Sequence, residues 1–215
     1  MFKILKLVEP GKYYHIYTHA NGSENLFREG ENYRYFLQRF GSFIPPVAHT
    51  LAYCLMPNHL HLLVQIKNES SLAEALKELK RIRTTDLTGF KNLSDLDFAN
   101  LSGLTVLQFS HLFNAYSKAY NKMYNRMGSL FTRSFHRKEI QSDQQLTSVI
   151  RYIHYNPVGH GFTKHPGEWP WSSYTTLLSR NKPDWLAGEW LIQWFGSLTE
   201  FQKMHEPPVK NPEST

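Results

Sequence analysis

The chain contains a single cysteine, Cys54, among its 215 residues. One thiol excludes a disulfide within the chain and any zinc site built from several cysteines. The sequence also lacks an apolar run long enough to cross a membrane, and its N-terminal segment is too short and too charged for a signal peptide. These absences predict a protein of the reducing cytoplasm that makes no contact with a membrane.

Acidic residues are also in short supply. The chain has 18 Asp and Glu against 24 Lys and Arg, which gives a net charge of +6 and a pI near 9.3. A surplus of this size is compatible with a polyanionic partner such as nucleic acid but does not require one. Hydrophobic residues make up 41% of the chain and aromatic residues 14%. That composition is sufficient for a folded core and excludes a disordered protein.

Turn dipeptides, capping residues and hydrophobic periodicity predict an alternation of strands and helices. One strand is expected at 13–19, before Asn21-Gly22, and a second, long strand lies within 49–66. Helices are expected at 32–43, from Ser71, from Ser110 to Met127, from Ser142 to Asn156 (where Pro157 stops it) and at 189–203. Strands followed by further helices favour an α+β fold over a doubly wound sheet.

The length predicts one domain, which we place at residues 1–180. The stretch 84–108 has mixed polarity and contains Gly89 and Gly103, so we interpret it as an irregular insertion. Residues 181–215 form a C-terminal extension, and about its last ten residues are expected to be disordered.

Two histidines, His59 and His61, stand two apart in the apolar run 52–66. Residues i and i+2 of a strand project from the same face, so the two imidazoles lie side by side. Histidine is the commonest protein metal ligand, and such a pair forms half of a divalent-metal site. Two unrelated histidines on a half-buried strand are the alternative at this point.

The predicted helix 142–156 carries two polar residues beside its apolar face. Tyr152 and Asn156 are four apart and are therefore neighbours on one flank. The amide oxygen of Asn156 suits a hard cation such as Mg²⁺ or Mn²⁺. Tyr152 has a phenol that can act as a nucleophile. Packing and helix termination are the alternative roles for this pair.

Taken in order, these motifs resemble those of the REP-associated tyrosine transposases, which are single-tyrosine HUH transposases of the insertion-sequence type. The match is carried by Met56–Val64 (MPNHLHLLV, with the HUH pattern), Tyr120–Phe135, Arg151–Val158 (RYIHYNPV) and Trp169–Tyr174 (WPWSSY). It covers roughly residues 10–178. His-x-His alone is a weak signal, whereas the ordered set that ends in Tyr-x-x-x-Asn-Pro is specific.

The resemblance implies a ferredoxin-like antiparallel sheet with helices packed on it, which is the fold of HUH-type nucleases. It implies that His59, His61 and Asn156 bind Mg²⁺ or Mn²⁺ and that Tyr152 is the nucleophile. The implied activity is metal-dependent cleavage and rejoining of single-stranded, hairpin-containing DNA through a 5′-phosphotyrosine intermediate, at the nucleoid. Whether one chain or a homodimer builds the site is open from the sequence, and Tyr155 is the alternative nucleophile.

DNA binding would rest on basic residues near these motifs. The candidates are Lys118, Lys122, Arg126, Arg133, Arg137, Lys138 and Arg151. Positions 133–135 read Arg-Ser-Phe where the family commonly has Gly-Arg-Phe, so we assign no specific DNA contact there.

Two other functions stay open from the sequence. One is a non-catalytic nucleic-acid-binding protein on the same scaffold, and the other is a metal-dependent phosphodiesterase that uses His-x-His. Hydrolases with a His-x-His-x-Asp-His motif need an acidic residue two positions after the second histidine. That position is Leu63 here, which disfavours the phosphodiesterase.

Overall fold

The computed structural model describes residues 8–85, 101–132 and 135–206. The main elements are β1 (Tyr13–His19), α1 (Gly30–Phe43), β2 (Ala48–Met56), β3 (His59–Ile66), α2 (Glu69–Thr85), α3 (Leu101–Met123), β4 (His136–Ile140) and α4 (Asp143–Gly159). A 3₁₀ turn (Pro166–Glu168) and the short helices α5 (Ser173–Leu178), α6 (Gly188–Trp194) and α7 (Leu198–Met204) follow. The strands form one antiparallel sheet in the order β2-β3-β1-β4.

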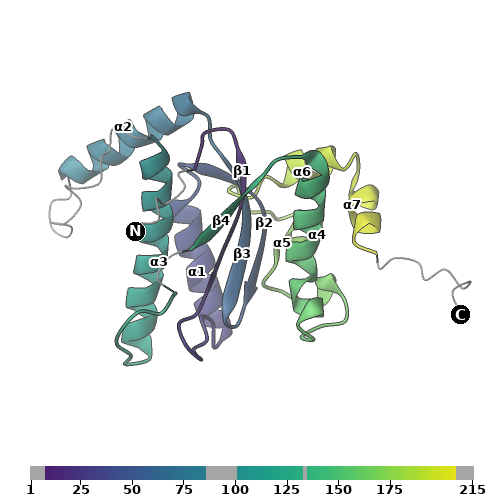
Figure 1. Cartoon of the computed structure of the whole chain (residues 1–215), viewed down its shortest axis with the longest axis horizontal. Helices are drawn as coiled ribbons and strands as arrows, with labels where there is room; N and C mark the ends of the chain where they lie inside the picture. Colours follow the sequence, from purple (N-terminus) through teal and green to yellow (C-terminus); the bar gives the residue numbers. More distant parts are fainter. Residues whose placement is uncertain (1–7, 86–100, 133–134, 207–215) are drawn as a thin grey trace, which may run out of the picture.

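Helices cover both faces of this sheet. α1 and α3 pack against each other on one face, whereas α4 lies on the other, with α5, α6 and α7 on the same side (Figure 1). Because both faces are covered, β2 and β3 are buried along nearly their whole length. The predicted α+β, ferredoxin-like architecture is confirmed.

The strand expected within 49–66 is a hairpin rather than one long strand. β2 ends at Met56, β3 begins at His59, and these two residues pair with each other. Pro57 and Asn58 form the connection. Both residues suit a turn, because proline fixes its own backbone angle φ and asparagine tolerates turn conformations. The correction places both histidines at the start of β3, beside the turn.

α4 begins as the sequence predicts and ends later. Ser142 caps it by accepting a hydrogen bond from the backbone N–H of Gln145 at 3.2 Å. The helix continues through Pro157 to Gly159 instead of ending at Asn156. Pro157 sits in the last turn, where the absence of its N–H removes a single helical bond. A left-handed Gly161, with φ +74°, then closes the helix end.

The region expected to be an irregular insertion is largely framed by helices. α2 begins at Glu69 rather than at Ser71, because Asn68 accepts the Ser71 backbone N–H at 2.9 Å. It extends to Thr85, and α3 begins at Leu101 rather than at Ser110. Buried side chains at Leu104 and other positions explain this early start, which the mixed polarity of the stretch obscures. The central residues, 86–100, lie outside the described part of the chain.

The predicted C-terminal extension packs on the main core as far as residue 206. Ala187 donates its backbone N–H to Thr50 of β2 at 2.8 Å, and Leu191 and Phe201 are fully buried. The helix expected at 189–203 is two helices, α6 and α7. Gly196, with φ +83°, separates them, and Ser197 caps the second. Among the described helices, none combines the length and apolar character that a membrane span requires.

Candidate metal centre and nucleophile

The pairing of β1 with β3 gathers imidazole and aromatic side chains on one face of the sheet. Tyr17 pairs with His61, and His19 pairs with His59. Side chains of directly paired residues project from the same face. His15 lies two residues before Tyr17 and joins them. The ring centroids of His59 and His61 are 5.2 Å apart, as are those of His19 and His59.

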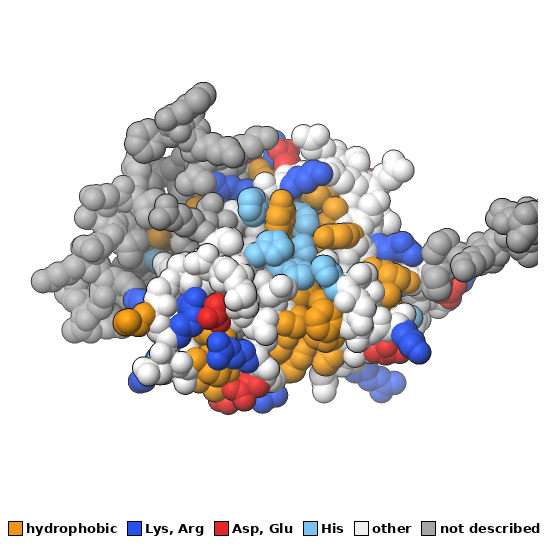
Figure 2. Space-filling view, turned by 60° about the horizontal axis from the view of Figure 1, so that its bottom comes forward, with side chains coloured by type: hydrophobic (Ala, Val, Ile, Leu, Met, Phe, Trp, Pro, Cys, Tyr) orange, Lys and Arg blue, Asp and Glu red, His pale blue; other side chains and the backbone are white. Residues whose placement is uncertain are grey.

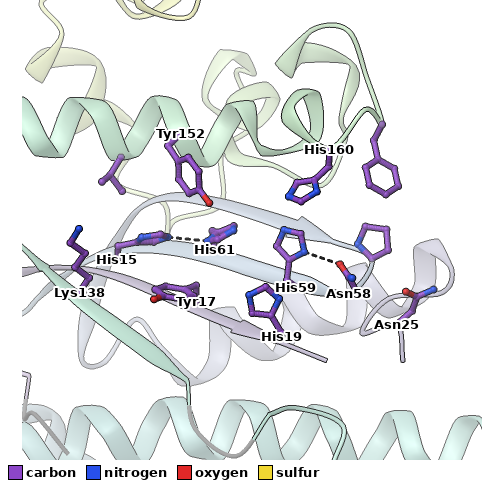
Figure 3. A pocket seen from close by; sticks show the side chains of 13 residues that line it. His15, Tyr17, His19, Asn25, Asn58, His59, His61, Lys138, Tyr152 and His160 are labelled. Atoms are coloured by element: carbon purple, nitrogen blue, oxygen red, sulfur yellow. Dashed lines mark hydrogen bonds between the residues drawn. The ribbon is translucent and has the colours of Figure 1, made fainter. Parts of the chain in front are cut away.

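These side chains line a pocket of about 700 Å³ between the sheet and α4 (Figure 3). Tyr152 reaches the pocket from α4, and His160 and Phe162 line it from just beyond the end of that helix. Lys138 lies toward one end of the pocket and Asn25 toward the other, with the histidines between them (Figure 3). On the molecular surface the histidine side chains gather in a single patch (Figure 2).

His59 is bracketed by two amide oxygens. Its Nε2 lies 2.8 Å from Asn156 Oδ1, and its Nδ1 lies 2.8 Å from Asn58 Oδ1. Burial lowers the pKa of His59, so the ring is neutral near pH 7 and carries one N–H. When that N–H is donated to Asn58, the Nε2 lone pair and the Asn156 oxygen converge. Two adjacent electron-pair donors of this kind form the edge of a cation site.

His61 is held in a similar way by a third imidazole. Its Nδ1 lies 3.0 Å from Nε2 of His15. Burial lowers the pKa of His61 to about 2 and that of His15 to about 4, so both rings are neutral at physiological pH. The contact leaves Nε2 of His61 available for another partner. An imidazole fixed through its other nitrogen is the usual arrangement of a histidine metal ligand.

Tyr152 faces the histidines from the opposite wall. Its ring centroid is 5.4 Å from that of His61 and 5.9 Å from that of His15, with the rings edge-on in both cases. The hydroxyl points into the pocket toward the histidines (Figure 3), and the side chain is 51% exposed. A single chain therefore brings together all four residues predicted from the sequence: His59, His61, Tyr152 and Asn156.

The donor set fits a divalent cation. Two neutral imidazoles and an amide oxygen are ligands that Mn²⁺ and related ions accept, and Mg²⁺ accepts the oxygen readily. In the part of the chain that the structure describes, no three His, Cys, Asp or Glu side chains are placed to share a metal ion. The candidate for a third donor is the amide of Asn156, whose oxygen lies 2.8 Å from Nε2 of His59 and which brings no charge. An ion held by neutral groups would keep most of its positive charge.

Among the described basic residues that were predicted to bind DNA, Lys138 is the one that lines the pocket, where it pairs with His15 across β1 and β4. Arg137 pairs with Ile16 and faces the other side of the sheet, with its guanidinium 5.4 Å from the ring centroid of Phe135. Lys118 and Lys122 are exposed on α3, which covers the face of the sheet away from α4 (Figure 1). Arg133 lies outside the described residues.

Arg126 and Arg151 hold parts of the protein together. Arg126 forms an ion pair with Glu24 at 3.1 Å and donates to the backbone oxygen of Ser129 at 3.0 Å. Arg151 donates to the backbone oxygens of Met204 and Glu206, at 3.0 and 3.2 Å. Contacts with DNA by these two guanidinium groups would compete with the contacts that they make in the folded chain.

The alternative nucleophile, Tyr155, is directed away from the pocket. Its hydroxyl donates a hydrogen bond to the backbone oxygen of His205, just beyond α7. The guanidinium of Arg151 lies over its ring, 4.5 Å from the centroid. These contacts fix Tyr155 on the side of α4 that faces the C-terminal helices.

Several pocket residues escaped the sequence prediction. They are His15, Tyr17, His19, Asn25, Asn58, His160 and Phe162. Three of them had a usable signal, because His15, Tyr17 and His19 alternate along β1 with the same period of two as His59 and His61 along β3. The others depend on how three connections fold back on the sheet: the hairpin turn for Asn58, the end of α4 for His160 and Phe162, and the segment between β1 and α1 for Asn25.

Comparison with known proteins agrees with the resemblance inferred from the motifs. No family model matches the chain. A protein of Haemophilus influenzae named as a REP-associated tyrosine transposase is 29% identical over 126 residues, and this match spans 58% of each of the two chains. A solved structure of a REP-associated tyrosine transposase bound to a REP hairpin superposes with a TM-score of 0.56 and 13% identity, covering 86% of this chain and 90% of the other. This chain and that solved structure therefore share a fold.

Proposed function

We propose that this protein is a metal-dependent single-stranded DNA transposase that cleaves and rejoins DNA through a 5′-phosphotyrosine intermediate. The observation that carries the proposal is the meeting of Tyr152 with His59 and His61 in one pocket of one chain, with the Asn156 amide oxygen 2.8 Å from Nε2 of His59. The similarity to two proteins named as tyrosine transposases supports the same chemistry.

His59, His61 and Asn156 would hold Mg²⁺ or Mn²⁺. When bound, the ion would polarise a phosphate oxygen and stabilise negative charge that develops during phosphoryl transfer. The protein prepares these ligands before DNA arrives, because Asn58 orients the ring of His59 and His15 orients that of His61. A preset arrangement reduces the ordering that DNA binding would otherwise require.

Tyr152 supplies the nucleophile. Its phenolic oxygen forms a bond to the phosphorus of the scissile phosphodiester while the bond from phosphorus to the 3′-oxygen breaks. The phenol loses its proton and the departing 3′-oxygen gains one, so the products are a 5′-phosphotyrosine and a free 3′-hydroxyl. Since 51% of the Tyr152 side chain is exposed, a backbone ester can reach the hydroxyl without disturbing the core.

The covalent intermediate allows resealing. The phosphotyrosine bond conserves the energy of the phosphodiester, as covalent intermediates of this kind do. A 3′-hydroxyl from another strand end attacks the phosphorus, the bond to the Tyr152 oxygen breaks, and the phenol regains a proton. Phosphodiester bonds are therefore exchanged without ATP.

The proposed substrate is single-stranded DNA that contains a hairpin. The pocket is an open cavity of about 700 Å³ with Lys138 at one end, and the chain carries a net charge of +6. Both features suit a phosphate backbone. The hairpin is inferred from the similar solved structure, which is bound to one. A homodimer is not needed to assemble the site, because one chain supplies every residue of the proposed centre.

Two alternatives make different predictions. A non-catalytic DNA-binding protein would bind the hairpin but form no covalent product. A His-x-His phosphodiesterase would cleave DNA with water and would not depend on Tyr152. The position of the Tyr152 hydroxyl, directed at the histidines, favours the tyrosine reaction over both (Figure 3).

The decisive test is covalent capture on a denaturing gel. A labelled library of single-stranded hairpins is incubated with the protein and Mg²⁺, and DNA of reduced mobility marks an adduct. We expect Tyr152→Phe to abolish the adduct and to leave binding nearly unchanged, since only the phenolic oxygen is lost. Tyr155→Phe is the matched control and should still form it. An adduct that persists in Tyr152→Phe would move the role to another residue, and cleavage without any adduct would support the phosphodiesterase.

A further inference from the structure

The end of α4 is built so that it returns the chain to the pocket. The backbone N–H of Phe162 donates to Pro157 O at 2.9 Å, and that of Gly161 donates to Val158 O at 3.0 Å. With Gly161 at φ +74°, these bonds form a Schellman motif. The helix that carries Tyr152 and Asn156 therefore also fixes the position of Phe162.

The ring of Phe162 is unusually placed for this motif. A hydrophobic residue at this position commonly packs back on the last turn of its own helix. Phe162 instead is 52% exposed and lines the pocket, with its ring centroid 5.5 Å from that of Trp169. Trp169 is itself anchored, because its Nε1 donates to Leu55 O of β2 at 3.0 Å. One side of the phenylalanine is thus supported and much of the rest is open to solvent.

The neighbours of Phe162 place it close to the proposed chemistry. His160, two residues earlier, has its ring centroid 5.0 Å from that of His59. Asn25, whose side chain is exposed, lies at the same end of the pocket as His160 (Figure 3). An exposed aromatic ring and an exposed amide that line the same pocket as His59 and His61 offer the two elements that hold an unpaired base: a stacking surface and a hydrogen-bonding edge.

We propose that Phe162 is a stacking platform for an unpaired nucleobase close to the cleaved phosphodiester. The inference rests on the proposed function, because it takes the strand whose backbone lies over His59 and His61 as the ligand. His160, two residues before Phe162, and Lys138 lie on opposite sides of His61 (Figure 3), so stacking on Phe162 would hold the strand on the side of the reacting phosphorus away from Lys138. The base next to the cleavage point would then be unstacked from its neighbour, which aligns the ester for attack by Tyr152.

The test compares two DNA ligands that differ only in their bases. Both are hairpins with short single-stranded tails, one of thymidines and one of abasic nucleotides, and fluorescence anisotropy measures the affinity. Phe162→Ala should weaken binding of the thymidine-tailed hairpin by about 5- to 150-fold, the range found for removal of one base–aromatic stack. It should leave binding of the abasic-tailed hairpin unchanged. Phe162→Trp should restore base-dependent binding, whereas Phe162→Leu, which is apolar but has no ring, should not.

Trp194→Ala is the matched control, because Trp194 is a partly exposed aromatic residue outside the pocket, and it should bind both hairpins as the wild type does. Equal losses of affinity for the two hairpins in Phe162→Ala, or full restoration by Phe162→Leu, would overturn the stacking proposal. A second outcome separates the two proposals. If Phe162→Ala loses affinity only for the thymidine-tailed hairpin, and the wild-type protein forms no adduct, the tyrosine reaction is overturned and the stacking site stands.

Discussion

A chain of hydrogen bonds buried behind α4 should make the stability of the protein depend on pH. His205 Nδ1 lies 2.8 Å from Phe201 O, a carbonyl that can only accept, so this nitrogen carries the proton. Nε2 of His205 then accepts from Nδ1 of His154 at 2.7 Å. Nε2 of His154 in turn accepts from Ser173 Oγ at 2.7 Å. Each ring donates once and accepts once, which requires both to be neutral.

The magnitude follows from burial. Both imidazoles have no exposed surface, and burial lowers the pKa of His154 and lowers that of His205 to about 4. In the unfolded chain both titrate near 6.5. The unfolded state therefore binds more protons below pH 6.5, and the free energy of unfolding falls as the pH falls from 6.5 toward 4. For His205 alone the loss reaches about 3 kcal/mol, at about 1.4 kcal/mol per pH unit.

Urea unfolding followed by tryptophan fluorescence, repeated across this pH range, measures the effect. His205→Gln is the informative variant, because its amide can still donate to Phe201 O and accept from His154 but does not titrate. The dependence of the unfolding free energy on pH should be shallower in this variant by about 1.4 kcal/mol per pH unit. His136→Gln, at an exposed position on β4, should keep the wild-type dependence. Equal slopes in the wild type and His205→Gln would refute the argument.

Two further predictions concern the pocket. Removal of divalent cations by a chelator, or separately His59→Ala or His61→Ala, should abolish the covalent adduct, since the proposed ion stabilises charge at the phosphate; an undiminished adduct in chelator would contradict the metal assignment. Binding of the tailed hairpin should weaken steeply with salt, and Lys138→Gln should reduce the slope of log affinity against log salt by about one. Arg137→Gln, on the opposite face of the sheet, is the matched control, and an unaltered slope in Lys138→Gln would exclude a phosphate contact by that lysine.

Local signals made part of the fold predictable. β1 was predicted with its observed bounds, because the turn dipeptide Asn21-Gly22 that ends it lies next to it in the sequence. The start of α4 was predicted from Ser142 and Gln145 for the same reason. The hairpin at Pro57 was missed because the residues on both sides of it are mostly apolar and buried, so the hydrophobic pattern runs on from β2 into β3.

The site was predictable only where sequence neighbours become spatial neighbours. His59 and His61 share a strand, and Tyr152 and Asn156 share a helix, so each pair could be inferred from a local period. The period of two along β1 puts His15 and His19 on one face of that strand, but only the register between β1 and β3 brings them to His59 and His61, and no short motif encodes a strand pairing over such a distance along the chain. Phe162 joins it through the Schellman turn after α4. The sequence predicted that Pro157 stops the helix, so a helix end beyond that residue was not expected.

The position of the proposed nucleophile is set by contacts on the far side of its helix. Successive residues of a helix are turned by about 100°, so His154 points away from the flank that carries Tyr152 and Asn156. His154 is held by Ser173 and His205, and Arg151 donates to the backbone just beyond α7. Rotation of α4 would break these bonds before it moved Tyr152 out of the pocket. The C-terminal helices, although remote from the proposed chemistry, therefore fix the angle at which the phenol faces the histidines, which is what a reaction that depends on alignment requires.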